Sequence, residues 1–290
     1  MKIIYKNFKI PKTNGFIDAT LYSNKHGNEY STNNSNVAPL LIFAHGFKGF
    51  KDWGGFPYLC EKIAENGFAV LSFNFSHSGV DAASPMDFTR LDLFAENTHT
   101  IELNDLDLVI NYLPQLAEDF PGQIDITRVG LIGHSRGGGL SVIAATEHSE
   151  INALVTLAAV GGFDRYTTEQ KKRWREKGYI EMPNTRTNQL MKMNVTLLDD
   201  IEINSERLDI QKSAAKLNIP YLIIQGKEDL AVKFTDAEKI YSSANKDQTK
   251  LVILENTGHT FGVEHPFKGS TNAFEEVIKL TAEFFKQNLW

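Results

Sequence analysis

The chain has 290 residues, of which 42% are hydrophobic and 23% are charged, and these fractions are typical of a globular protein. Its formal net charge of −6, without a stripe of Lys and Arg, argues against nucleic-acid binding. The single cysteine, Cys60, excludes an intramolecular disulfide and a cysteine-based metal cluster. The start of the chain lacks the apolar core of a signal peptide, and no apolar run is long enough to cross a membrane. We therefore expect a cytoplasmic protein that does not bind membranes.

The order of apolar runs along the chain predicts a sheet covered by helices. Two alternating segments, 2–10 and 16–22, surround Asn14-Gly15 and predict a hairpin, and an Asn- and Ser-rich loop follows at 24–36. Continuous apolar runs predict buried strands at 39–44, 69–75, 129–132, 153–158, 220–224 and 251–254. The segments between them predict helices at 56–66, 96–113, 140–145, 234–244 and 271–287. This alternation indicates an α/β fold with a mostly parallel sheet and helices on both faces.

The alternation stops between Gly161 and about Leu217, where two strands are joined by a connection far longer than usual. We predict a core of residues 1–160 and 211–290 and an inserted helical cap of residues 161–210 over the carboxyl edge of the sheet. Its lysines and arginines are expected to form a solvated helix face. Its methionines are expected to supply an apolar wall of the substrate pocket; they are Met182, Met191 and Met193. The alternative is an ordinary long crossover without a role in substrate binding.

A glycine-flanked serine lies between a predicted strand and a predicted helix, in the sequence Gly133-His134-Ser135-Arg136-Gly137. This is the context of a nucleophile elbow, a strand-to-helix turn so sharp that its backbone is strained. Glycines two residues before and after the serine remove side chains that would clash there. The hydroxyl would lie at the N-terminus of a helix, whose dipole favours developing negative charge. We predict that Ser135 is a nucleophile, the alternative being a plain Gly/Ser-rich turn.

A nucleophilic serine needs a base to take its proton and an acid to orient that base. The acid is expected just after the next-to-last strand, where Asp229 and Glu228 lie. We favour Asp229, because its spacing from Gly226 allows a turn to aim the carboxylate inward. The base is expected after the last strand, where we favour His259 over His265, which precedes a proline in a charged loop.

The oxyanion of the reaction needs two backbone N–H donors. One is predicted to be the residue after the nucleophile, Arg136, and the other Phe47, in the loop that follows the first buried strand. His45 is expected to order this loop by hydrogen bonding without acting as a base. The histidines do not show the spacing of a metal site, and no glycine loop has the lysine of a nucleotide site, so we expect neither a metal nor a cofactor.

These motifs together resemble the α/β-hydrolase superfamily, from about residue 37 to the C-terminus. The His45-Gly46-Phe47 loop and the insertion are similar to dienelactone-hydrolase-like and cinnamoyl-esterase-like serine hydrolases. The resemblance implies an eight-stranded sheet with one antiparallel strand, a cap and a Ser–Asp–His triad. Dienelactone hydrolases use a cysteine nucleophile, so Ser135 disfavours dienelactone itself as the substrate.

The predicted function is hydrolysis of small-molecule carboxylic esters with small to medium or aromatic acyl groups, through an acyl-enzyme. A feruloyl or cinnamoyl esterase is one alternative, and a prolyl-oligopeptidase-like peptidase or amidase is another. A non-catalytic binding module would be expected to lack a member of the triad, and none is missing. The sequence leaves open whether the chain is a monomer or a homodimer.

Overall fold

The computed structural model describes residues 3–24, 37–184 and 189–290, so the predicted loop at 24–36 lies almost wholly outside the described residues. Eight strands form one sheet in the order β1-β2-β4-β3-β7-β8-β11-β12. The strands are β1 (Ile3–Lys12), β2 (Gly15–Asn24), β3 (Ala38–Ala44), β4 (Ala69–Phe73), β7 (Ile124–His134), β8 (Ile151–Leu157), β11 (Tyr221–Gly226) and β12 (Thr249–Leu254). β2 pairs antiparallel with both of its neighbours, and the other neighbouring pairs are parallel. The predicted sheet with one antiparallel strand is therefore confirmed.

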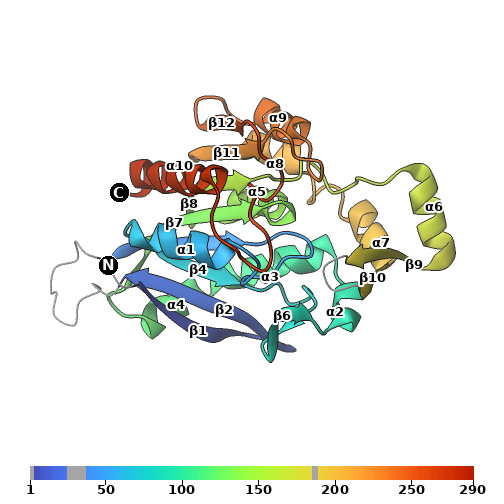
Figure 1. The fold of residues 1–290 in the computed structure, drawn as a ribbon, viewed down its shortest axis with the longest axis horizontal. Helices are drawn as coiled ribbons and strands as arrows, with labels where there is room; N and C mark the ends of the chain where they lie inside the picture. The colour runs from blue at the N-terminus through green and yellow to red at the C-terminus, as the bar shows by residue number, and fades with distance from the viewer. Residues whose placement is uncertain (1–2, 25–36, 185–188) are drawn as a thin grey trace.

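Helices cover both faces of the sheet (Figure 1). Two helices pack together on one face, α1 (Phe56–Glu65) and α10 (Asn272–Leu289). The other face carries α3 (His99–Asn111), α4 (Leu113–Asp119), α5 (Arg136–Glu147), α8 (Ile210–Lys216) and α9 (Phe234–Ser243). Among the described residues, no helix is long and apolar enough to cross a membrane.

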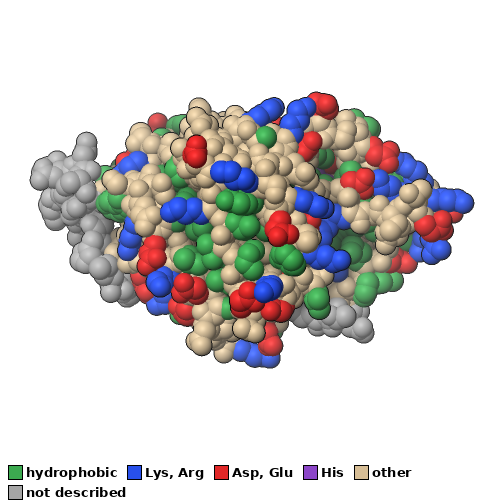
Figure 2. Space-filling model, turned by 90° about the horizontal axis from the view of Figure 1, so that it is seen from above, with side chains coloured by type: hydrophobic (Ala, Val, Ile, Leu, Met, Phe, Trp, Pro, Cys, Tyr) green, Lys and Arg blue, Asp and Glu red, His purple; other side chains and the backbone are tan. Residues whose placement is uncertain are grey.

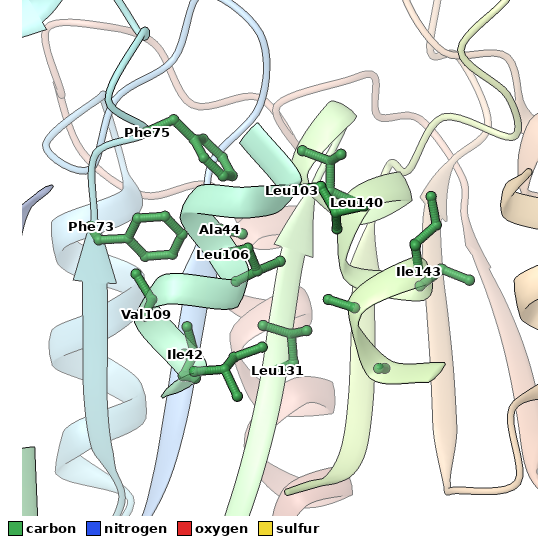
Figure 3. Packing of buried hydrophobic residues seen from close by; sticks show 14 of the residues in the cluster. Ile42, Ala44, Phe73, Phe75, Leu103, Leu106, Val109, Leu131, Leu140 and Ile143 are labelled. Atoms are coloured by element: carbon green, nitrogen blue, oxygen red, sulfur yellow. The ribbon is translucent and has the colours of Figure 1, made fainter. Parts of the chain in front are cut away.

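The central strands are apolar along their whole length because helices cover both faces of the sheet. A strand buried on both faces has no position at which a polar side chain could reach water. In β3, every residue from Pro39 to Ala44 is buried. Figure 3 shows the packing on one face, where side chains of the sheet meet those of two helices: Ile42, Ala44, Phe73 and Leu131 meet Leu103, Leu106, Val109, Leu140 and Ile143.

The predicted helix at 96–113 corresponds to α3, and a further short helix, α4, follows it directly. Thr98 caps α3 by accepting a hydrogen bond from the backbone N–H of Ile101, and α3 ends at Asn111. Pro114 lies in the first turn of α4. A proline is tolerated there because the first-turn N–H groups have no intrahelical partner. Three short elements between β4 and α3 were not predicted: β5 (Val80–Asp81), β6 (Ser84–Phe88) and α2 (Leu91–Ala95).

The sequence predicted a helical insertion between β8 and β11, but the structure shows strands there as well as helices. It contains α6 (Thr168–Lys177), β9 (Tyr179–Asn184), β10 (Gln189–Asn194) and α7 (Thr196–Ile203), which lie together at one end of the molecule (Figure 1). β9 and β10 form an antiparallel hairpin, and the residues between them, 185–188, are outside the described part of the chain. Gly178 ends α6 in the left-handed conformation, with a φ of 80°. The alternation of buried Met191 and Met193 with exposed Lys192 is the two-residue period of a strand, in a segment too short for the pattern to be decisive.

The lysines and arginines of α6 form a solvated face, as expected, and several of them are also paired with carboxylates. Arg175 pairs with Asp199 and Glu202 of α7, at 2.8 and 2.7 Å. Arg173 pairs with Glu169 one turn away, at 2.9 Å. Figure 2 shows acidic and basic side chains side by side at this end of the molecule.

Candidate active site

The structure brings the three predicted side chains together at the carboxyl edge of the sheet. Ser135 follows β7, Asp229 follows β11 and His259 follows β12. The Nε2 atom of His259 lies 3.0 Å from the Oγ atom of Ser135, and its Nδ1 atom lies 2.7 Å from Oδ2 of Asp229. An ionised carboxylate can only accept, so Nδ1 donates to Asp229. In the neutral ring, Nε2 is then free to accept the serine proton.

The turn that carries Ser135 is strained in the way the motif predicts. Ser135 has a φ of 57° and a ψ of −118° between the end of β7 and the start of α5. A side chain on Gly133 would contact the carbonyl oxygen of Gly137 at 2.5 Å, and one on Gly137 would collide with the carbonyl oxygens at the end of β3. The flanking glycines therefore let the turn close against the loop that follows β3.

Asp229 is held by more hydrogen bonds than the one to His259. Its Oδ1 atom accepts the backbone N–H groups of Ala231 and Val232, both at 2.8 Å. Its Oδ2 atom also accepts from Nε2 of Gln225, at 3.0 Å. Burial opposes ionisation of this carboxyl group, but the hydrogen bond and charge of His259, together with these donors, hold its pKa below the usual value. Asp229 is therefore an ionised, fixed acceptor.

Gln225 is a site residue that the sequence did not reveal. It is fully buried, and its Nε2 atom also lies within hydrogen-bond distance of the carbonyl oxygens of Gly226 and Val232. A buried amide among strand residues gives no periodic signal by which it could be found. Its position four residues before Asp229, at the end of β11, is the trace it leaves in the sequence.

The two rival residues have other partners. Glu228 accepts the backbone N–H of Thr257 at 2.8 Å through Oε2, so it braces the loop that carries His259. His265 accepts the backbone N–H of Gly54 at 2.8 Å through Nδ1. The loops of Asp229 and His259 approach closely because Gly226 has no side chain, since an added Cβ atom would lie 2.6 Å from the carbonyl oxygen of Thr257.

The loop after β3 lies directly against the serine turn. A Cβ atom on Gly46 would be 2.7 Å from Cβ of Ser135. His45 is buried, donates from Nδ1 to the carbonyl oxygen of Gly46 at 2.9 Å and accepts the backbone N–H of Phe75 at Nε2. Burial lowers the pKa of His45 to about 4, so the ring is neutral and holds the loop in place. This is the ordering role expected of it.

His134, inside the motif, has a similar role on the other side of the site. Its Nε2 atom donates to the carbonyl oxygen of His259 at 3.1 Å, and the two rings pack with centroids 4.9 Å apart. Burial, and then the neighbouring His259, lower the pKa of His134 to about 3. A neutral His134 therefore holds the backbone of His259 in place.

Two cavities lie beside His259, and Ser135 lines one of them. One, of about 400 Å³, is lined by Ser135, Arg136, Val160, Phe163, Tyr166 and Met182, among others. The second, of about 270 Å³, is lined by Trp53, Phe56, His134, Asn184 and His265, among others. Phe47 and His259 line both cavities. Space is therefore present on two sides of the His259 ring.

The insertion reaches these cavities through the hairpin and the segment after β8. Met182 lines the larger cavity and Asn184 the smaller one. Met191 and Met193 are instead buried in the core, at 0% and 2% exposure. Of the three methionines predicted to form a pocket wall, Met182 is therefore the one that lines a cavity beside Ser135. All three methionines belong to one hairpin, and its sequence alone does not distinguish a core position from a position that lines a cavity.

Two family models match the chain. The model of the prolyl oligopeptidase family covers residues 94–289, and the PET hydrolase-like model covers residues 5–168. YitV of Bacillus subtilis, a protein named as an esterase, is 26% identical over 234 residues, which are 78% of this chain and 85% of that protein.

Solved structures show the same fold. Est1E from Butyrivibrio proteoclasticus with bound ferulic acid has a TM-score of 0.68 at 20% identity, covering 97% of this chain and 98% of its own. Dienelactone hydrolase from Anabaena variabilis has a TM-score of 0.63 at 17% identity, covering 100% of both chains. Each family model covers more than half of the chain. The chain therefore belongs to the prolyl oligopeptidase and PET hydrolase-like families and is a hydrolase of the α/β-hydrolase superfamily.

Proposed function

We propose that this chain is a serine esterase that cleaves small-molecule carboxylic esters with small to medium or aromatic acyl groups. The observation that carries the proposal is the His259 ring, which lies beside two cavities and bridges Ser135 Oγ at 3.0 Å and Asp229 Oδ2 at 2.7 Å. Relatives named as esterases support ester cleavage as the activity.

The reaction proceeds in two halves. Ser135 Oγ attacks the acyl carbon while His259 Nε2 takes the hydroxyl proton, and the carbonyl π electrons move to the oxygen. Backbone N–H groups of Phe47 and Arg136 stabilise this oxyanion. When the carbonyl reforms, the bond to the alcohol breaks and His259 gives its proton to the leaving oxygen. Water then attacks the acyl-enzyme by the same route, and Asp229 stabilises the charged ring in both halves.

The larger cavity suits the acyl group. Its apolar lining includes Val160 of the core and Phe163 and Met182 of the insertion. Lys48, beside Phe47, donates to the carbonyl oxygen of Pro183 at 3.0 Å and so joins the oxyanion loop to the hairpin. These contacts support a role for residues 161–210 as a cap that closes over Ser135.

A peptidase or amidase is the second candidate, because the prolyl oligopeptidase model covers residues 94–289. Ester and amide substrates share the triad and the oxyanion hole, and they differ in the leaving group, which His259 must protonate more completely for an amine. Substrate preference therefore decides between the two functions.

A panel of p-nitrophenyl esters from acetate to decanoate, with methyl ferulate and an aminoacyl p-nitroanilide, tests the proposal. We expect kcat/KM for the best ester to exceed that for the anilide by about 10²-fold or more. We expect it to rise with acyl length, since each buried methylene contributes about 0.8 kcal/mol, and then to fall where the cavity ends. A higher kcat/KM for the anilide than for every ester would contradict the esterase proposal and favour a peptidase or amidase.

Met182→Ala should move the preferred acyl chain toward longer esters while p-nitrophenyl acetate is still cleaved. The change removes apolar wall from the cavity beside Ser135, so a longer chain gains about 0.8 kcal/mol for each methylene it can newly bury. The matched control is Met193→Ala, which changes a buried methionine of the same hairpin. If the acyl-length profile of Met182→Ala is the same as that of the wild type, the insertion is an ordinary crossover without a role in substrate binding.

A further inference from the structure

We propose that Glu102 is a positioning residue for the oxyanion hole, which it holds in shape through the side chains of Arg136 and Phe47. The inference deepens the proposed function and rests on it. Glu102 lies in α3 and is 3% exposed. It is not among the residues that line the two cavities beside His259.

The first step is the buried charge pair. Oε1 of Glu102 lies 3.4 Å from a terminal nitrogen of Arg136 and accepts from Nδ2 of Asn97 at 2.7 Å. Arg136 itself is 7% exposed. Burial opposes ionisation of Glu102, but the charge of Arg136 together with the contacts to His99 and Asn97 outweighs burial and lowers the pKa of Glu102 to about 2. The pair is therefore ionised, and removing one partner would leave a buried charge without compensation.

The second step joins this pair to the oxyanion loop. The guanidinium carbon of Arg136 lies 4.0 Å from the ring centroid of Phe47, in the geometry of a cation–π contact. Phe47 also stacks on Phe94, with centroids 5.4 Å apart and an interplanar angle of 27°. The two residues proposed to donate their backbone N–H groups to the oxyanion thus contact each other through their side chains.

The consequence concerns the spacing of the two donors. One donor is on α5 and the other on the loop after β3, so their separation depends on how these two segments pack. Glu102 fixes the guanidinium, and the guanidinium fixes the face of Phe47. An oxyanion hole acts only when its donors are preorganised at the position of the oxyanion. Loss of the Glu102 charge should therefore weaken transition-state stabilisation more than binding of the intact ester.

The experiment compares Glu102→Gln with Asp105→Asn. Asp105 is the matched control, because it lies about one turn further along α3, is fully buried, pairs with Lys12 and accepts the backbone N–H of Ser76. Each variant is assayed for kcat and KM on a p-nitrophenyl ester and for inhibition by an alkyl trifluoromethyl ketone, whose adduct with the serine places an oxyanion in the hole.

We expect Glu102→Gln to lower kcat by about 10²-fold, which is near the effect of removing one oxyanion donor. The inhibition constant of the ketone should rise by a similar factor. The KM of Glu102→Gln should stay within about threefold of the wild type. Asp105→Asn should keep kcat within about threefold. Glu102→Asp, which retains the charge, should recover part of kcat, and this variant also serves if Glu102→Gln does not fold.

A double-mutant cycle with Phe47→Leu tests the route of the effect. Leucine keeps the backbone N–H and removes the aromatic face, so Glu102→Gln should cost much less kcat in that background than in the wild type. Additive losses would overturn the inference, as would an unchanged kcat in Glu102→Gln. A changed acyl-length preference at unchanged kcat would also overturn it, because Glu102 would then act on the pocket through His99, whose ring stacks on Phe163.

The wild type and Ser135→Ala are measured in the same assays. If the wild type cleaves esters through Ser135 and Glu102→Gln matches it, the positioning role alone fails. If the wild type neither cleaves an ester nor binds the ketone, the proposed function fails and the positioning role fails with it.

Discussion

Ser135→Ala is expected to lower kcat by about 10⁴-fold or more on any ester that the wild type cleaves. The change removes the Oγ atom that lies 3.0 Å from His259 Nε2, and thus the nucleophile. Both serine and alanine carry a Cβ atom, so the strain of the positive φ is the same and the fold should be retained. Steady-state kinetics and a thermal unfolding curve measure the two effects.

The double variant with His259→Ala provides the control for this assignment. His259→Ala alone should cost a similar factor, and the double variant should cost little more, because nucleophile and base act as a unit. His265→Ala is the matched histidine variant and should lose far less kcat than His259→Ala, since Nδ1 of His265 accepts the backbone N–H of Gly54 and the ring lines only the smaller of the two cavities. Activity that survives Ser135→Ala, or that is lost with His265 and not with His259, would contradict the assignment.

Asp229→Asn should lower kcat by about 10⁴-fold with little change in the fold. An amide at this position can present an N–H to His259 Nδ1, which favours the ring tautomer whose Nε2 carries the proton and cannot accept from Ser135. Because the pKa of Asp229 is lowered in the fold, the wild-type carboxylate stays ionised at and above pH 5, and protonation of Asp229 should not limit activity there.

Glu228→Gln is the control for Asp229→Asn, because it makes the same chemical change at the neighbouring residue. Glu228 accepts the backbone N–H of Thr257 through Oε2, and the amide oxygen of glutamine can accept the same bond. We expect kcat within about threefold of the wild type. A larger loss in Glu228→Gln than in Asp229→Asn would exchange the roles of the two carboxylates.

Local patterns in the sequence were enough to predict the sheet and the places where its strands end. The residues of β3 from Pro39 to Ala44 are buried, and a run of apolar residues signals this without reference to the rest of the chain. The strained turn at Ser135 is equally local, because glycines at fixed offsets report a backbone that excludes side chains. Since parallel strands end at one edge, the chain positions of Ser135, Asp229 and His259 also placed them on one edge of the sheet.

The tertiary structure alone decided what surrounds these residues. Asp229 rather than Glu228 meets His259 because Gln225 and the backbone N–H groups of Ala231 and Val232 aim its carboxylate, and these contacts depend on how the chain turns after β11. The split of the insertion into a helix pair and a hairpin was likewise hidden, since six-residue strands give too short a pattern.

The contact between Glu102 and Arg136 shows the same limit most clearly. The two residues are 34 positions apart, on helices that pack side by side only once the sheet has formed beneath them. A glutamate and an arginine on helices usually indicate solvated faces, and neither residue carries a sequence signal for burial. Local sequence thus determined where the candidate reacting groups lie along the chain, and long-range packing determined which buried charged groups lie beside them.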